Sequence, residues 1–181
     1  FFQYKPSAQK LVIKRYWHID KEFKIIISPG DAIEKFNELF TASVKKRLRS
    51  DVALGTSLSG GLDSSTIVCA IQNLKVNLHQ LKTFSAVFPG FEKDESIYIN
   101  LLANKLDVTN FKTQPTADGL IKDFEKLCYH QEEPFQSSSI YAQYKVFELA
   151  KHNDVKVLLD GQGADEILAG QNPAIFLVSY Y

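Results

Sequence analysis

The sequence predicts an α/β protein built on an open parallel sheet with helices on both faces. Short apolar runs alternate with helical patterns from residue 31 to residue 170, which is the order of repeated βαβ units. Two of these runs, near Ser57 and Leu159, lead directly into a glycine turn and a helix start. The second run, residues 155–159, is almost wholly apolar, as expected of a strand covered on both faces. We therefore expect a ligand site at the carboxyl ends of these strands.

The composition is that of an ordinary globular domain. Of the 181 residues, 45% are hydrophobic and 23% are charged, which is enough apolar material for a core. Because 21 basic residues balance 21 acidic ones, we expect no nucleic acid or anionic membrane as a partner. No apolar run has the length of a membrane span. Cys69 and Cys128 form no C-x-x-C pair, so we expect free thiols and a cytoplasmic location.

The first 30 residues are expected to form a linker. They contain two β-like runs, at residues 11–13 and 23–27. Asp31 and Glu34 have the spacing of a capping box, which predicts a helix that continues to about Ser50. The chain starts at Phe1 and contains no methionine, so we also expect a piece of a longer protein. The predicted buried stripe of the first helix is Ile33, Phe36, Phe40, Val44 and Leu48.

Further strands and helices follow the first glycine turn and its helix. Residues 81–88 and 108–112 are predicted strands, and residues 137–153 a long helix. Asp94 and Thr116 are predicted to cap the two helices between these segments. The apolar positions predicted to face inward on the three helices are Tyr98, Leu101, Leu102 and Leu106, then Leu120, Ile121, Phe124 and Leu127, then Ile140, Tyr144 and Phe147.

The first glycine turn has the composition of a phosphate site. It reads Ser59-Gly60-Gly61, and residues 63–66 fall in the first turn of the helix that follows. Glycines let the backbone approach a ligand, while unpaired N–H groups and the helix dipole favour an anion. The lysine of a Walker A motif is absent. A purely structural turn is the alternative for a glycine–serine segment of this kind.

A second glycine turn, residues 160–163, also joins a strand to a helix start. Asp63 and Asp165 each lie a few residues beyond a strand end, so the fold could bring them to one site. Mg²⁺ binds through one or two carboxylates together with phosphate oxygens. We therefore predict a magnesium–triphosphate site, with helix capping as the alternative role of each aspartate.

Both motifs resemble those of a known enzyme family. Leu-Ser-Gly-Gly-Leu-Asp-Ser-Ser, residues 58–65, resembles the pyrophosphate loop of the ATP pyrophosphatases, and within that group the asparagine synthetases and β-lactam synthetases. Asp-Gly-Gln-Gly-Ala-Asp-Glu, residues 160–166, resembles the asparagine synthetase motif Ser-Gly-Glu-Gly-x-Asp-Glu. The resemblance covers nearly all of residues 31–170 and implies an adenine nucleotide alpha hydrolase-like, Rossmann-like fold.

The resemblance also implies roles for individual residues. Asp63 and Asp165 would bind magnesium, and ATP would be the nucleotide. The other implied roles are pyrophosphate binding by Ser59, Gly60, Gly61, Ser64 and Ser65, adenosine binding by Ser57, Ala86, Asp160 and Gly161, and a catalytic set of Gln162, Asp165 and Glu166.

The activity implied by the resemblance is that of an ATP-dependent carbon–nitrogen ligase. Aspartate would be adenylated with release of pyrophosphate, and ammonia from glutamine would then displace AMP. Residues 1–30 would be the end of a glutaminase domain, and residues 31–181 the N-terminal portion of the synthetase domain. A homodimer is among the arrangements that this resemblance allows.

Several positions depart from the family pattern. Gln162 stands where the asparagine enzymes have glutamate, which leaves the acceptor carboxylate open. Beyond Gly170, Gln171-Asn172-Pro173 interrupts the pattern, and the family's downstream lysine and N-terminal cysteine nucleophile have no counterpart in these residues. We therefore expect this chain alone to be inactive. A related amidotransferase acting on another carboxylate, as in β-lactam or surface-polysaccharide modification, and a nucleotide-binding remnant without chemistry are the alternatives.

Overall fold

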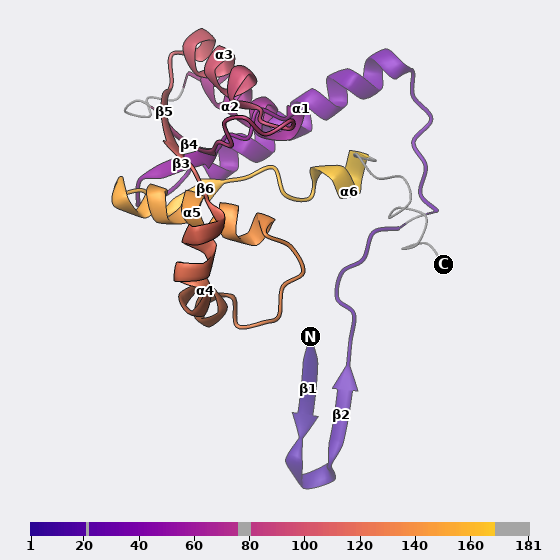
Figure 1. Ribbon diagram of the computed structural model, residues 1–181. Helices are drawn as coiled ribbons and strands as arrows, with labels where there is room; N and C mark the ends of the chain where they lie inside the picture. Colours follow the sequence, from indigo (N-terminus) through magenta and orange to yellow (C-terminus); the bar gives the residue numbers. More distant parts are fainter. Residues whose placement is uncertain (21, 76–80, 169–181) are drawn as a thin grey trace. The chain divides into compact units, whose positions relative to one another are not determined.

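The computed structural model describes residues 1–20, 22–75 and 81–168, and its contacts divide into two units, Phe1–Asn37 and Glu38–Tyr181 (Figure 1). The predicted interruption after Gly170 lies outside the described residues. None of the described helices combines the length and apolarity needed to cross a membrane. Cys69 and Cys128 are free thiols, as predicted.

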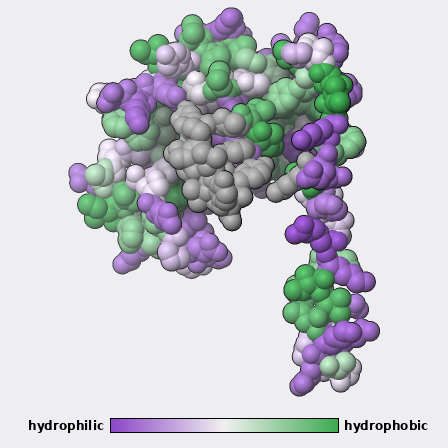
Figure 2. All heavy atoms as spheres, turned by 90° about the vertical axis from the view of Figure 1, so that its right-hand side faces the viewer, coloured by the Kyte–Doolittle hydropathy of each residue, from purple (hydrophilic) through white to green (hydrophobic). Residues whose placement is uncertain are grey.

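The first unit begins with a small antiparallel hairpin. Strand β1 (Phe2–Lys5) pairs with β2 (Lys10–Ile13) across the short 3₁₀ helix η1 (Pro6–Ala8). Hydrophobic side chains of the hairpin are exposed, and Figure 2 shows hydrophobic atoms gathered on it. Of the two β-like runs, residues 11–13 form part of strand β2, whereas residues 23–27 form no strand. A β-prone run becomes a strand only where a sheet edge is offered, and the described strands of this unit pair with each other alone.

Helix α1 (Pro29–Arg47) begins three residues earlier than the predicted capping box requires. The Ser28 hydroxyl accepts from the Asp31 backbone N–H at 3.2 Å and donates to the Asp31 carboxylate at 2.8 Å. Ser28 is therefore the capping residue, with Pro29 in the first helical position, where its missing N–H costs nothing. Of the predicted stripe, Val44 and Leu48 are buried, while Ile33 is 71% exposed.

The second unit contains a parallel sheet of four described strands. They are β3 (Leu54–Ser57), β4 (Lys82–Ala86), β5 (Thr109–Thr113) and β6 (Val157–Leu159), in the order β5-β4-β3-β6. The chain moves outward from β3 to β5 and then returns to the other side of β3. The order therefore reverses between β3 and β6, and such a point is where open α/β sheets bind ligands.

Helices cover both faces of this sheet (Figure 1). One apolar cluster joins α2 (Leu62–Asn73), α3 (Ser96–Leu106) and the end of α1 to the sheet, through Val68, Ile99 and Val44 among others. A second cluster joins Phe84 of β4 to α5 (Ser139–His152), which also packs on α4 (Ala117–Gln131). The predicted α/β class is confirmed. The expectation that residues 155–159 form a strand covered on both faces is only partly met, because β6 is an edge of the described sheet and Val157 is 40% exposed.

The buried faces of α3 and α5 differ from those predicted. On α3 the deepest side chain is Ile99, whereas Tyr98 and Leu101 are exposed. On α5 the buried positions include Tyr141 and Val146, while the predicted Phe147 is exposed. Both helices carry more apolar side chains than one face can bury, so periodicity alone leaves the phase undetermined.

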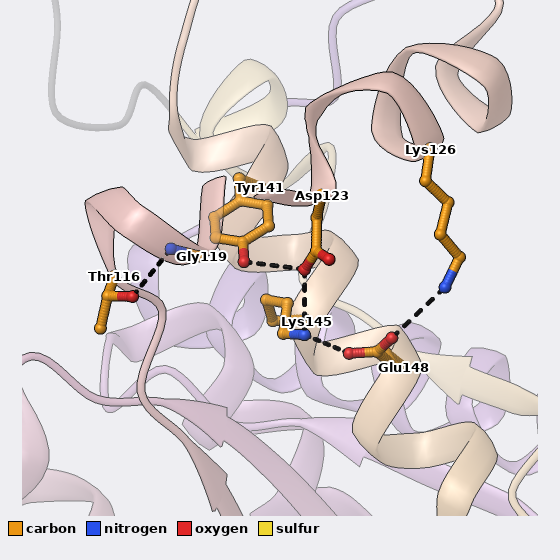
Figure 3. A network of polar contacts seen from close by, with 7 residues as sticks. All are labelled: Thr116, Gly119, Asp123, Lys126, Tyr141, Lys145 and Glu148. Carbon is orange, nitrogen blue, oxygen red and sulfur yellow. Dashed lines mark hydrogen bonds and ion pairs between the residues drawn. The ribbon is translucent and has the colours of Figure 1, made fainter. Parts of the chain in front are cut away.

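Polar contacts fasten α4 to α5 (Figure 3). The Tyr141 hydroxyl donates to the Asp123 carboxylate at 3.0 Å, and Lys145 lies 3.4 Å from the same oxygen. Lys145 also pairs with Glu148, which Lys126 approaches at 3.6 Å. The Tyr141 hydrogen bond, more than any other cause, holds the pKa of Asp123 below its ordinary value. This network helps to stabilise the face of α5 that meets α4.

The start of α4 confirms one predicted cap. The Thr116 hydroxyl accepts from the Gly119 backbone N–H at 3.1 Å. Gly119 has a second reason to lack a side chain, since an added Cβ would lie 2.7 Å from the Tyr141 hydroxyl oxygen. Gly119 therefore contacts both the helix cap, Thr116, and the polar network, through Tyr141.

Replacing Tyr141 by Phe should lower the free energy of unfolding by about 1 kcal/mol, and Tm by roughly 2–4 °C, because one hydrogen bond is lost. Asp123 has a lowered pKa when folded, so its contribution is present above its unfolded pKa and is lost as pH falls through the folded value. The variant should therefore lose less stability than wild type on acidification. Thermal melts from pH 7 to pH 3 test this, with Tyr129→Phe as the control, since Tyr129 is 78% exposed. Equal acid sensitivity in wild type and Tyr141→Phe would contradict the assignment.

Candidate functional site

A cleft of about 250 Å³ lies at the carboxyl ends of β3, β4 and β6. Ser57 is the last residue of β3, Ala86 is the last of β4, and Asp160 directly follows β6. All three line the cleft, as does Ser59, so four of the predicted nucleotide-binding residues share one concave surface. The complete lining is Ser57, Leu58, Ser59, Phe84, Ala86, Phe88, Lys93, Glu95, Ala142, Gln143, Val146 and Asp160.

The first glycine turn has the predicted strand–turn–helix form. Gly60 adopts a φ of +90°, and a Cβ there would lie 3.0 Å from the Glu95 Cβ and 3.1 Å from its carbonyl oxygen. A glycine is therefore needed both for the backbone conformation and for the close approach. The Ser64 hydroxyl accepts a hydrogen bond from the Ser59 backbone N–H at 3.2 Å and lies 3.0 Å from the Ser59 hydroxyl. Ser65 donates back to the Gly61 carbonyl at 2.6 Å, which steadies the first turn of α2.

Buried polar side chains hold the strand end from which this turn leaves. Ser85 of β4, 1% exposed, donates to the Leu58 carbonyl at 2.5 Å. Asn110 of β5 donates to the Ser85 hydroxyl at 2.9 Å, and this orients the serine proton towards Leu58. These hydrogen bonds run from β5 through β4 to Leu58, the residue after β3 and directly before Ser59, so they hold the point where the turn begins.

The second motif lies directly against the first. The Ser57 hydroxyl donates to the Asp160 carboxylate at 3.2 Å, between the ends of β3 and β6. A Cβ at Gly161 would lie 2.9 Å from the Asp63 Cβ and 3.3 Å from the Ser64 nitrogen. The absence of a side chain at Gly161 therefore lets the second turn contact the first turn of α2. The two turns therefore meet at the start of α2, whereas the meeting of Asp63 and Asp165 at one site stays a prediction.

The residues predicted to bind metal or to act in catalysis are less closely associated with the cleft. Asp63 is half-buried in the first turn of α2, whereas Gln162, Asp165 and Glu166 are exposed, the last two in the short helix α6 (Ala164–Leu168). None of these four residues belongs to the lining of the cleft, as far as the described residues show it. The described residues also contain no group of three or more His, Cys, Asp or Glu side chains able to hold a metal ion by themselves. The magnesium assignment stays a prediction.

Sequence reasoning missed several lining residues. Phe88, Lys93 and Glu95 come from the segment between β4 and α3, and Gln143 comes from α5. The Pro89-Gly90 break after β4 was a usable signal, because it marks a loop at the carboxyl edge of the sheet. Gln143 gave none, since a polar residue in an amphipathic helix is ordinarily taken for a solvent-facing one.

Asp94 has another role than the predicted helix cap. Its carboxylate accepts from the Phe88 backbone N–H at 3.0 Å and from the Ser96 hydroxyl at 2.8 Å. The Phe88 bond first, and the Ser96 bond second, keep the pKa of Asp94 below its ordinary value. The residue before α3 is Glu95, whose side chain makes no cap bond. Asp94 thus closes the loop that carries three of the lining residues.

The sequence of this chain is similar to those of known proteins. The family model described as asparagine synthase matches residues 35–177. A putative glutamine-hydrolysing asparagine synthetase 2 of Methanocaldococcus jannaschii is 39% identical over 160 residues, which are 86% of this chain and 29% of that protein. The glutamine-hydrolysing asparagine synthetase 1 of Bacillus subtilis is 30% identical over 175 residues, 94% of this chain and 26% of that protein. The chain thus spans less than a third of the length of these relatives.

Among solved structures, the NH3-dependent NAD synthetase of Campylobacter jejuni in complex with nitrate is similar with a TM-score of 0.47 and 14% identity, over 81% of this chain and 62% of that one. The family match covers both glycine-turn motifs and every lining residue of the cleft. The chain belongs to the asparagine synthase family.

Proposed function

We propose that this chain is the nucleotide-binding part of an ATP-dependent asparagine synthetase. The observation that carries the proposal is the contact between the two glycine turns, where Gly161 approaches Asp63 at the point of strand reversal between β3 and β6. A nucleotide across this point would have its triphosphate at the first turn and its ribose near Ser57 and Asp160. The membership of the chain in the asparagine synthase family supports the same reaction class.

In the proposed reaction a substrate carboxylate attacks the α-phosphorus of ATP, and pyrophosphate leaves. Ser59, Gly60, Gly61, Ser64 and Ser65 hold the departing pyrophosphate through hydroxyls and backbone N–H groups at the start of α2. Ammonia, supplied from glutamine by a glutaminase domain in the full-length protein, then displaces AMP to form the amide. Such catalysis rests mainly on positioning and on stabilising developing charge.

The donor set suits Mg²⁺ bound jointly by protein and phosphate. Asp63, half-buried beside Gly161, and Asp165 supply carboxylate oxygens, and the described residues offer no complete metal cage. Mg²⁺ binds in this manner, with one or two carboxylates and the substrate's phosphates. The bound ion would neutralise charge on the leaving pyrophosphate. Glu166 follows Asp165 in α6, in the motif that we assign to catalysis.

The acceptor that we propose is aspartate, with a different carboxylate as the second candidate. Gln162 is the observation that favours the second, because an uncharged amide replaces the family's glutamate at an exposed position beyond the cleft. Comparing aspartate-dependent with aspartate-independent pyrophosphate release by the full-length protein, with ammonia present, separates the two. Release that does not respond to aspartate would exclude it as the acceptor.

ATP binding should require a divalent cation. The two motifs provide N–H donors for phosphate but also two carboxylates, Asp63 and Asp165, which repel it unless a cation intervenes. Titration calorimetry of the full-length protein with α,β-methylene ATP should show at least roughly tenfold weaker binding in EDTA than in Mg²⁺, the loss expected when about 1.4 kcal/mol is removed. Equal affinity in both conditions would exclude the proposed metal site.

A further inference from the structure

Gln143 presents an unused amide to the cleft. It is the single Asn or Gln among the described lining residues, and it lies on α5 beside Ala142 and one turn from Val146, which also line the cleft. Its side chain makes no hydrogen bond to any of the residues that the structure describes. The other uncharged polar side chains of the lining are engaged: Ser57 with Asp160 and Ser59 with Ser64. A half-buried amide with free donors and a free acceptor can form hydrogen bonds to a ligand.

The two ends of the cleft differ in chemistry. Glu95 marks the phosphate end, because its backbone lies against Gly60 in the first glycine turn. Ser57 and Asp160 lie at the strand ends, where hydroxyl and carboxylate groups suit a sugar. The apolar wall is made of Phe84, Ala86, Phe88, Ala142 and Val146. A flat aromatic base fits such a wall, and Gln143 lines the cleft from α5, next to Ala142 of that wall.

We propose that Gln143 binds the edge of the adenine base and thereby contributes to nucleotide selection. The inference rests on the proposed function, since it requires ATP in this cleft. A glutamine amide offers one acceptor and one donor side by side, and adenine presents an amino group beside a ring nitrogen that complement them. A flipped amide also fits the carbonyl and ring N–H of guanine, so affinity alone does not test the assignment.

The decisive variant is Gln143→Glu, which keeps the size of the side chain and removes its donor. A carboxylate only accepts, so it suits the two adjacent N–H donors of guanine and opposes the ring-nitrogen acceptor of adenine. Its charge repels the phosphates of both nucleotides alike, so the ratio of the two affinities isolates the base contact. That ratio, ATP over GTP, should fall by roughly tenfold or more when one hydrogen bond is lost to adenine and one is gained by guanine.

The experiment is calorimetry of the full-length protein with the Mg²⁺ complexes of α,β-methylene ATP and α,β-methylene GTP. Gln143→Leu should weaken the binding of the ATP analogue by roughly three- to tenfold, since it removes hydrogen bonds without adding charge. Gln136→Glu is the matched control: Gln136 is exposed, lies outside the lining and should leave the ratio unchanged. Thermal melts confirm that each variant is folded.

Two results would overturn the inference, and they are distinguishable. Wild type that binds the ATP analogue, with an unchanged ratio in Gln143→Glu, would overturn the role of Gln143 and leave the proposed function standing. Wild type that binds neither nucleotide would overturn both. A ratio that shifts towards the GTP analogue in Gln143→Glu, but not in Gln136→Glu, supports the assignment.

Discussion

Full-length protein carrying Asp63→Asn or Asp165→Asn should lose ATP turnover by about 100-fold or more, equivalent to about 2.7 kcal/mol of transition-state stabilisation. Asparagine keeps the shape of the side chain but removes the charge that we assign to Mg²⁺ binding. Asp63 is the stronger test, because its Cβ lies where the Gly161 turn meets α2. In wild type, ATP labelled at the α and γ positions should yield AMP and pyrophosphate, not ADP.

A matched control separates charge at the site from charge at a helix start. Asp118 lies in the first turn of α4, as Asp63 lies in that of α2, but it is exposed and outside the cleft lining. Loss of a carboxylate at either helix start should cost only about 0.3–1 kcal/mol of stability through the helix dipole. Asp118→Asn should therefore retain turnover. ADP and phosphate as the main wild-type products, or near-normal rates in both Asp63→Asn and Asp165→Asn, would refute the assignment.

The parts of the site that could be predicted are those formed by residues that are contiguous in the sequence. A strand, a glycine turn and a helix start are local features, so the segments at Ser59 and Gly161 were recognised from their residues alone. Their meeting followed from a general rule, because parallel strands place their carboxyl ends at one edge of the sheet. The contact of Gly161 with Asp63 and the Ser57–Asp160 hydrogen bond also require that β6 pairs with β3, which the rule does not predict.

The parts that could not be predicted depend on how separate elements are oriented. Gln143 reaches the cleft because α5 buries Tyr141 and Val146, whereas periodicity favoured Tyr144 and Phe147. The sequence of α5 offers apolar side chains in both phases, and the hydrogen bond from Tyr141 to Asp123, 18 residues away, is one of the contacts that stabilise the phase observed. A tertiary partner of this kind leaves no trace in the periodicity of the helix.

A similar reason explains the errors near residue 30. Ser28 caps α1 by accepting from the Asp31 N–H, but Asp31 and Glu34 have the same three-residue spacing, so the pattern is degenerate. Pro29 was the feature that could have decided, since proline favours the first position of a helix. Residues 23–27 illustrate another limit: the run has β propensity but forms no strand, because a strand also needs a partner.

The contact between the two motifs is best tested at Gly161. In Gly161→Ala the new Cβ would lie 2.9 Å from the Asp63 Cβ and 3.3 Å from the Ser64 nitrogen, both on the first turn of α2. Since these are not the far ends of flexible side chains, the second turn must move away from α2, at a cost of about 1–3 kcal/mol for an overpacked site. Affinity for Mg²⁺ with α,β-methylene ATP should then fall by roughly 10- to 100-fold, because the two halves of the site separate.

Gly30→Ala is the control: Gly30 lies in α1, a Cβ there would meet only the Ser28 hydroxyl at 3.7 Å, and alanine favours a helix. It should bind nucleotide as wild type does and be no less stable. If Gly161→Ala also binds as wild type does, the close approach of the two turns is not what forms the nucleotide site, and the proposed function loses the observation that carries it.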